Sequence, residues 1–151
     1  MTERIWRGCA IPDDRLYDVE RHVWVRFEEQ DAVLGMTDVA QTIGGKIVHV
    51  AWKAPGRVVA RGRPLAMIES AKWVGPFPSP LTGEIVATNE AAFARDVLIA
   101  NRDPYGEGWL VRLRPTQLDE ERGALLDGET AFERYREVID AEQINCFRCA
   151  D

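Results

Sequence analysis

The sequence is poor in lysine and histidine and has no long apolar run. Its 151 residues include two histidines, and 19 Lys and Arg stand against 25 Asp and Glu, which gives a net charge of −6. So acidic a chain lacks the clustered cations that bind nucleic-acid phosphates. No stretch approaches the roughly 18 apolar residues of a membrane helix, and the first residues do not resemble a secretion signal. We therefore expect a cytoplasmic protein that binds neither nucleic acid nor membranes.

Motifs of metal sites and of self-sufficient enzymes are also absent. There is no GxxxxGK loop and no GxSxG elbow, and neither His22 nor His49 lies at metal-ligand spacing. We expect His49, in an apolar strand, to be a structural histidine. Cys9, Cys146 and Cys149 are an odd number, and in a reducing compartment we expect no structural disulfide. The sequence predicts no metal and no catalytic residue.

The remaining pattern indicates one mainly β domain. Residues 23–33 alternate apolar and polar side chains around a polar turn and predict a hairpin. Thr37 can cap a short helix that ends near Gly44. From residue 46 to 109 the apolar runs, among them residues 97–100, are short and separated by Gly and Pro, which favours a small barrel or sandwich.

A short repeat and two helices complete this prediction. The run at 45–48 recurs at 83–86, and an Ala-Arg pair and a second strand follow each copy, at residues 60 and 94. This indicates two similar halves, although G-x-I-V is also common in unrelated strands. After Pro115 we expect one helix that Asp127-Gly128 stops and a second in which Phe132, Tyr135 and Val138 or Ile139 recur at helical spacing.

Lys72 is the residue that stands out chemically. Only three of the 19 basic residues are lysines, and Lys72 lies in the segment MIESAKWVGPF, in a turn between two expected strands. Arginine cannot replace lysine where an amine must become an amide, because its guanidinium stays protonated. Lys72 is therefore a candidate for modification, although most turn lysines are simply solvated.

Several segments together resemble the glycine cleavage system H protein family: GMTDVAQ (35–41), GGKIVHV (44–50), PGRVVARG (55–62), IESAKWV (68–74), PSPLTGEIV (78–86) and DPYGEGWLVRLRP (103–115). The resemblance covers roughly residues 16–135. It implies a barrel-sandwich hybrid, a lipoyl-domain-like fold with a short N-proximal helix and C-terminal helices. It also implies lipoic acid in amide linkage on Lys72, with Glu69 and Gly83 helping the lipoate-attaching enzyme recognise the turn.

The sequence departs from this family at two acids of the expected arm cleft. Family members usually have an acid before the first strand's Trp and another four residues after the lipoyl lysine, where this chain has Val23 and Pro76. These acids are thought to hold a cationic aminomethyl group. With His22, Trp24 and Trp73 the two replacements predict an apolar cleft for the arm, although Asp18, Glu20 or Glu84 could substitute for the missing acids.

The C-terminal end is a further departure. We expect one carrier domain over residues 1–140 and a flexible tail over 141–151, in which Cys146 and Cys149 form a CxxC pair of possible redox thiols. An inert tail with incidental cysteines is the alternative.

These departures resemble the H-like lipoate-binding proteins of heterodisulfide-reductase-like sulfur oxidation. The resemblance implies a non-catalytic swinging-arm carrier of sulfur-bound intermediates whose partners are a lipoate-attaching enzyme and the enzymes of that complex. Three alternatives remain open: an aminomethyl carrier of glycine cleavage, a relay that donates lipoate to other proteins, and a thiol oxidoreductase using Cys146 and Cys149.

Overall fold

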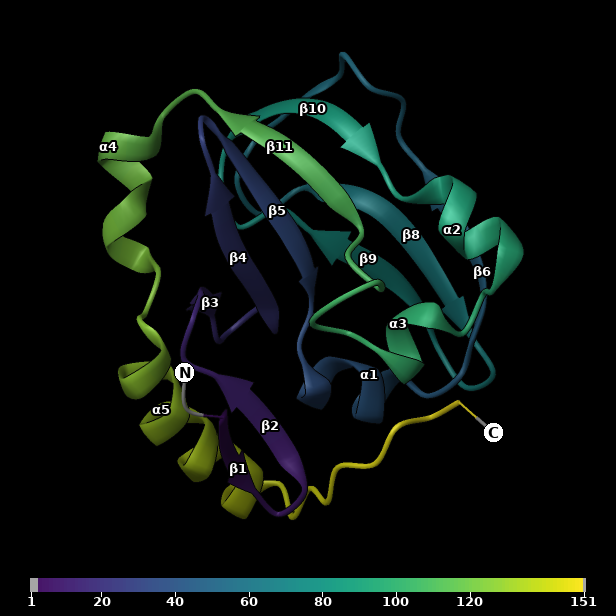
Figure 1. Ribbon diagram of the computed structural model, residues 1–151, viewed down its shortest axis with the longest axis vertical. Helices are drawn as coiled ribbons and strands as arrows, with labels where there is room; N and C mark the ends of the chain where they lie inside the picture. The colour runs from purple at the N-terminus through teal and green to yellow at the C-terminus, as the bar shows by residue number, and fades with distance from the viewer. Residues whose placement is uncertain (1–2, 151) are drawn as a thin grey trace.

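A computed structural model describes residues 3–150, which form two facing sheets flanked by short helices (Figure 1). The larger sheet is antiparallel, with the order β3 (Leu16–Asp18), β4 (Val23–Glu28), β5 (Asp31–Met36), β11 (Val111–Pro115), β10 (Gly83–Thr88) and β7 (Val58–Val59). The smaller sheet contains β6 (Ile47–Trp52), β8 (Pro64–Ser70) and β9 (Val74–Pro78). This is the expected mainly β, lipoyl-domain-like architecture with C-terminal helices.

The remaining elements lie around these sheets. A separate two-stranded hairpin contains β1 (Glu3–Trp6) and β2 (Cys9–Pro12). The helices are α1 (Asp38–Gly44), α2 (Glu90–Arg95), α3 (Ile99–Arg102), α4 (Leu118–Glu121), the 3-10 helix η1 (Arg122–Ala124) and α5 (Gly128–Ala141). No helix in the described residues is both long and apolar enough to cross a membrane.

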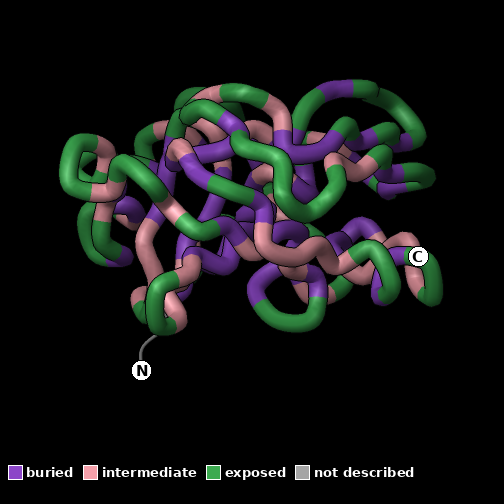
Figure 2. The backbone as a smooth tube through the Cα atoms, turned by 90° about the horizontal axis from the view of Figure 1, so that it is seen from above, coloured by how far each residue is buried: buried purple, intermediate pink, exposed green. Residues whose placement is uncertain are grey.

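The first half of β4, Val23 to Val25, is buried on both faces of the strand, which divides the apolar interior into two cores. Val25 packs into the core between the sheets, whereas its neighbour Trp24 packs with Tyr17 and Tyr135 into a second core that α5 covers. Figure 2 shows the buried stretches running through the middle of the molecule and the exposed ones at its loops. The second core is where the C-terminal helix joins the β-domain.

The predicted hairpin and first helix are confirmed. Strands β4 and β5 pair from Val23↔Met36 to Glu28↔Asp31. The Thr37 hydroxyl accepts a hydrogen bond from the Ala40 N–H at 3.2 Å and caps α1. The helix ends at Gly44, and Gly45 follows with φ +80°, a conformation that glycine adopts without strain.

The prediction of a strand at residues 97–100 is wrong, because this segment leads into α3. The Leu98 N–H donates to the Asp96 carboxylate at 3.1 Å, an Asx turn that competes with an extended strand. Asn101, fully buried in α3, accepts from the Ile47 N–H at 3.0 Å and donates to the Gly45 carbonyl at 3.0 Å. The second copy of the predicted repeat therefore has the helix α3 where the first copy has the strand β8. Only the short G-x-I-V runs form strands in both copies.

Two smaller predictions also need correction. Asp127 does not stop a helix but starts α5, since its carboxylate accepts the Thr130 N–H at 2.8 Å. That hydrogen bond is the main cause that holds the pKa of Asp127 below its usual value. His49 is exposed on β6 rather than held inside the sheet. The second C-terminal helix is confirmed and buries Tyr135 and Ile139.

The chain ends are joined, contrary to the sequence-based expectation. Cys9 of β2 forms a disulfide with Cys146, with 4.8 Å between their Cα atoms, so the prediction of no structural disulfide is wrong. The Cys146 N–H also donates to the Arg7 carbonyl at 3.0 Å. Residues 144–150, part of the expected tail, form neither helix nor strand and run past α1 toward the smaller sheet (Figure 1).

Candidate functional site

Lys72 lies at the tip of the hairpin that joins β8 to β9. The Ser70 N–H donates to the Trp73 carbonyl at 2.7 Å and closes the turn, while the Lys72 N–H donates to the Ser70 hydroxyl at 3.2 Å. The Ala71 N–H donates to the Lys46 carbonyl at 3.0 Å and ties the turn to the start of β6. The backbone that carries Lys72 is thus fixed from two sides.

The side chain of Lys72 is exposed, and its amine is not engaged by another described residue. Within the described part of the chain, its amine takes part in no hydrogen bond or ion pair. The side chain passes close to Gly45, where an added Cβ would lie 2.8 Å from the Lys72 Cε. Gly45 therefore both ends α1 and leaves room for the lysine.

An apolar cleft of about 370 Å³ adjoins this hairpin. Its apolar lining comes from α1, β5, β8 and β9 and includes Met36, Ile43, Ile68, Trp73, Pro76 and Phe77. Glu20, Arg21 and His22 are its polar lining residues. Because Trp73 directly follows Lys72, a chain attached to the lysine could fold back into this cleft.

The cleft contains three of the five residues expected there. His22, Trp73 and Pro76 line it, whereas Val23 and Trp24 are fully buried and lie in the two cores. The Trp24 indole N–H donates to the Pro104 carbonyl at 2.9 Å, which fixes the ring away from solvent. An acid at position 23 would therefore have to be buried in the core between the sheets.

The polar residues of the cleft are largely engaged with neighbours. The His22 ring stacks on Tyr135, with its Nδ1 3.0 Å from the Tyr135 hydroxyl, and burial lowers the pKa of this imidazole. Arg21 donates to the carboxylate of Asp18 at 2.8 Å. Glu20, by contrast, is exposed and is the one acid among the lining residues of this cleft.

A second cavity, of about 350 Å³, lies on another side of Lys72. The hairpin contributes Ala71 and Lys72, residues 45–46 contribute Gly45 and Lys46, and the C-terminal segment contributes Phe147, Arg148 and Cys149. The final residues of the chain therefore border the lysine. Sequence reasoning missed this contact, since residues 72 and 149 meet only in the folded chain.

The predicted thiol pair of Cys146 and Cys149 does not exist in the structure. Cys146 is bonded to Cys9, and Cys149 is a free, buried cysteine. Burial raises the pKa of the Cys149 thiol. Cys149 is therefore predominantly a neutral thiol at pH 7 rather than a reactive thiolate, and this arrangement contradicts a thiol oxidoreductase built on the CxxC pair.

The two residues expected to guide lipoate attachment lie in different sheets. Glu69 is exposed on β8, one residue before the end of that strand, and lies opposite His49 on β6 and Val74 on β9. Gly83 is buried in β10, where an added Cβ would lie 2.4 Å from the Arg114 carbonyl oxygen. The structure thus gives Gly83 a packing role between strands, while Glu69 is on the hairpin that carries Lys72.

Fold and site together define a small β protein that presents one lysine on a rigid hairpin beside an apolar cleft. The family model for the glycine cleavage H-protein matches residues 15–138. Glycine cleavage system H protein 2 of Aquifex aeolicus is 43% identical, covering 97% of this chain and 92% of its own length. H protein 3 of that organism is also 43% identical, covering 95% and 91%.

A solved structure supports the same assignment. The crystal structure of a glycine cleavage system H protein from Mycobacterium marinum matches with a TM-score of 0.71 and 32% identity, covering 83% of this chain and 98% of that one. The chain belongs to the glycine cleavage H-protein family.

Proposed function

We propose that this protein is a lipoyl carrier with lipoic acid in amide linkage on Lys72. The observation that carries the proposal is the exposed, unpaired amine at the tip of a hairpin whose backbone is fixed from two sides. The residues present fit such a group, because an alkyl chain and a dithiolane are apolar and the adjoining cleft is lined by Met36, Ile68 and Trp73.

The chain's own residues hold and present the group rather than react. The closed turn fixes the position of Lys72, and Gly45 leaves its side chain free to swing. Tethering keeps an intermediate at high effective concentration near each partner enzyme. When bound, lipoate supplies a disulfide that can be reduced and loaded.

Attachment of lipoate tests this proposal. The chain is incubated with a lipoate-attaching enzyme, ATP and lipoate, and its intact mass and peptides are measured. We expect one lipoyl group per chain on Lys72 and none on the Lys72→Arg variant. Lys46→Arg is the matched control, since Lys46 lines the same cavity and should not be needed. Modification of Lys72→Arg, or none of the wild type, would contradict the proposal.

For the cargo, we propose sulfur-bound intermediates of a heterodisulfide-reductase-like oxidation system. A cationic aminomethyl group needs a carboxylate in its pocket, because a lost charge-assisted hydrogen bond costs about 1.5–3 kcal/mol. Position 76 supplies proline in the cleft, and Val23 is fully buried in the core between the sheets. The partners would be the enzymes of that system together with a lipoate-attaching enzyme, in the cytoplasm.

An aminomethyl carrier of glycine cleavage is the second candidate. Exposed Glu20 lines the cleft, and the relatives bear glycine cleavage names. The lipoylated chain is mixed with glycine decarboxylase and aminomethyltransferase, and exchange of bicarbonate into glycine is measured. We expect no efficient exchange; efficient exchange that Glu20→Gln abolishes would overturn the sulfur cargo.

A further inference from the structure

The two ends of the chain form one joint structure outside the part that matches the family model. The match covers residues 15–138. Residues 3–12 and 142–150 lie beyond it, and we call them together the terminal clasp. The Cys9–Cys146 disulfide and the hydrogen bond from the Cys146 N–H to the Arg7 carbonyl join its halves. The M. marinum H protein, matched over 98% of its length, covers only 83% of this chain.

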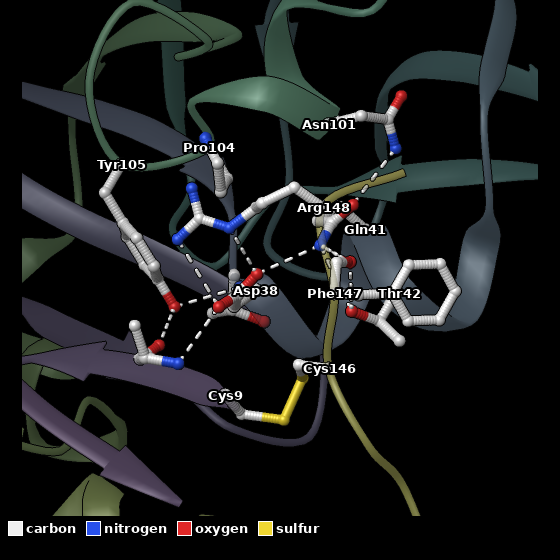
Figure 3. A network of polar contacts seen from close by, with 12 residues as sticks. Cys9, Asp38, Gln41, Thr42, Asn101, Pro104, Tyr105, Cys146, Phe147 and Arg148 are labelled. Carbon is white, nitrogen blue, oxygen red and sulfur yellow. Dashed lines mark hydrogen bonds and ion pairs between the residues drawn. A yellow bond between two sulfur atoms is a disulfide. The ribbon is translucent and has the colours of Figure 1, made fainter. Parts of the chain in front are cut away.

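Both halves of the clasp converge on one buried carboxylate (Figure 3). Asp38 of α1 is only 1% exposed and accepts a hydrogen bond from the Ala10 N–H at 3.0 Å. It also accepts one from Arg148 Nε at 2.9 Å and one from Gln41 Nε2 at 3.0 Å. Arg148 is the one cation paired with Asp38 in the described residues. A buried carboxylate needs such a partner, so Arg148 and the segment around it have a defined seat.

The end of the clasp is held mainly by polar contacts of α1. Gln41 donates to the Phe147 carbonyl at 2.7 Å and accepts from the Cys149 N–H at 3.0 Å. The Phe147 side chain is 66% exposed and contributes little burial. Without the disulfide, residues 147–149 would be held by these polar contacts of α1 and by the hydrogen bond from Arg148 to the Arg102 carbonyl, and segments held in this way open locally before the whole fold does.

This end of the clasp is also a wall beside Lys72. Phe147, Arg148 and Cys149 line the same cavity as Lys46 and Lys72. We propose that the terminal clasp is a redox-controlled latch: the closed Cys9–Cys146 disulfide holds the wall beside Lys72, and its reduction releases residues 145–150 and opens that side of the lysine.

The reaction that opens the latch is a thiol–disulfide exchange with a dithiol. One dithiol sulfur attacks the Cys9–Cys146 bond and forms a mixed disulfide, and its second sulfur then displaces the remaining cysteine. Two electrons and two protons pass to Cys9 and Cys146, which become thiols, and the reductant becomes a cyclic disulfide. On the lipoylated chain, reduced lipoate is itself a dithiol of this class and would serve as the reductant, becoming the cyclic disulfide; this role rests on the proposed function.

Alkylation of Cys149 measures release of the wall on the unmodified chain. Cys149 is 7% exposed while the latch is closed. After reduction by dithiothreitol, or in the Cys9→Ala/Cys146→Ala variant, we expect iodoacetamide to alkylate Cys149 at least about tenfold faster than in the oxidised wild type. Circular dichroism confirms that the β-domain stays folded. The Arg148→Ala variant, which keeps the disulfide but loses the ion pair with Asp38, should be alkylated faster than the oxidised wild type and more slowly than the reduced chain.

Labelling of the three lysines shows whether the wall shields the proposed attachment site. With an acetylating reagent and peptide mapping, Lys72 and Lys46 should react at least about twofold faster after reduction. Lys53 is the internal control. Its amine donates to the Pro64 carbonyl at 2.6 Å and does not line this cavity, so its rate of acetylation should not change on reduction.

Either of two results overturns the latch. Equal alkylation of Cys149 in the oxidised and reduced chains would show that the disulfide does not hold the wall. Loss of the circular dichroism signal on reduction, with all lysines labelled alike, would show global unfolding instead of local release. Because no lipoate is involved, neither result bears on whether Lys72 is lipoylated.

Discussion

At the scale of single residues, Gly35 packs closely against the Trp24 indole. Both are buried, and an added Cβ at Gly35 would lie 2.4 Å from the indole ring, which its hydrogen bond to Pro104 holds in place. We predict that Gly35→Ala lowers the free energy of unfolding by about 1–3 kcal/mol, as overpacking does, measured by urea denaturation.

The matched control for this change is Gly123→Ala. Gly123 is exposed in η1 and has no atom within 4 Å of an added Cβ. Its substitution should alter the free energy of unfolding by no more than about 0.5 kcal/mol. Equal effects of the two substitutions would contradict the packing argument.

His22 makes the stability depend on pH. Burial lowers its pKa in the folded protein below the ordinary 6.5, so the unfolded chain takes up a proton first as the pH falls. The stabilisation is complete above pH 6.5 and is lost as the pH falls toward the folded-state pKa. We predict a loss of at most about 1.4 kcal/mol per pH unit from this group, measured by urea denaturation between pH 7.5 and 5.

The His22→Asn variant isolates this contribution. Asparagine tolerates the left-handed backbone of residue 22, where φ is +58°. The variant should lose less stability than the wild type over the same pH range. Parallel pH profiles for the two proteins would show that His22 is not the group responsible.

At the scale of elements, α1 connects the cleft to the clasp. Its Ala40 and Ile43 line the cleft, while Asp38 and Gln41 hold the C-terminal segment. The helix has seven residues, so its buried cap Thr37 matters. We predict that Thr37→Ala costs about 1–2 kcal/mol of unfolding free energy, with faster amide exchange at Ala40 by hydrogen-exchange mass spectrometry.

Thr37→Ser separates the cap from the methyl group. Serine keeps the hydroxyl that accepts the Ala40 N–H, so amide exchange in α1 should stay close to that of the wild type. If the two variants exchange alike, the cap is not what holds the first turn of α1.

The elements that could be predicted are those that local sequence determines. Alternation over residues 23–33 and the cap at Thr37 predicted β4, β5 and α1, and the turn around Lys72 followed from small residues between two strands. Residues 97–100 were predicted as a strand because a four-residue apolar run does not reveal its period. The buried hydrogen bonds of Asn101, which favour α3, join residues more than 50 positions apart.

At the scale of the whole molecule, the ends depend on each other. Cys9 and Cys146 are separated by 137 positions, and nothing local in the sequence pairs them. The pairing of Cys146 with Cys149 was predicted from proximity along the chain alone. In the folded chain Cys146 is paired with Cys9 instead, because α5 packs against β1, β2 and β3 and brings residue 146 back to β2.

The disulfide should therefore stabilise the whole fold. Closing so long a loop in the unfolded chain is worth up to about 5 kcal/mol in the chain-entropy description. We predict that the oxidised wild type unfolds at a higher urea midpoint than the Cys9→Ala/Cys146→Ala variant. The difference in unfolding free energy should be about 2–5 kcal/mol. Identical midpoints would show that the bond is absent from the folded protein in solution.

Trp73 gives the molecule an optical reporter next to its attachment lysine. Its indole is 44% exposed and lines the cleft. A chain seated in the cleft would exclude water from that ring, and its emission would shift to shorter wavelength. Trp24 is fully buried, so its emission should not respond to the arm. The difference in fluorescence between wild type and Trp73→Phe would therefore follow the arm as it enters and leaves the cleft.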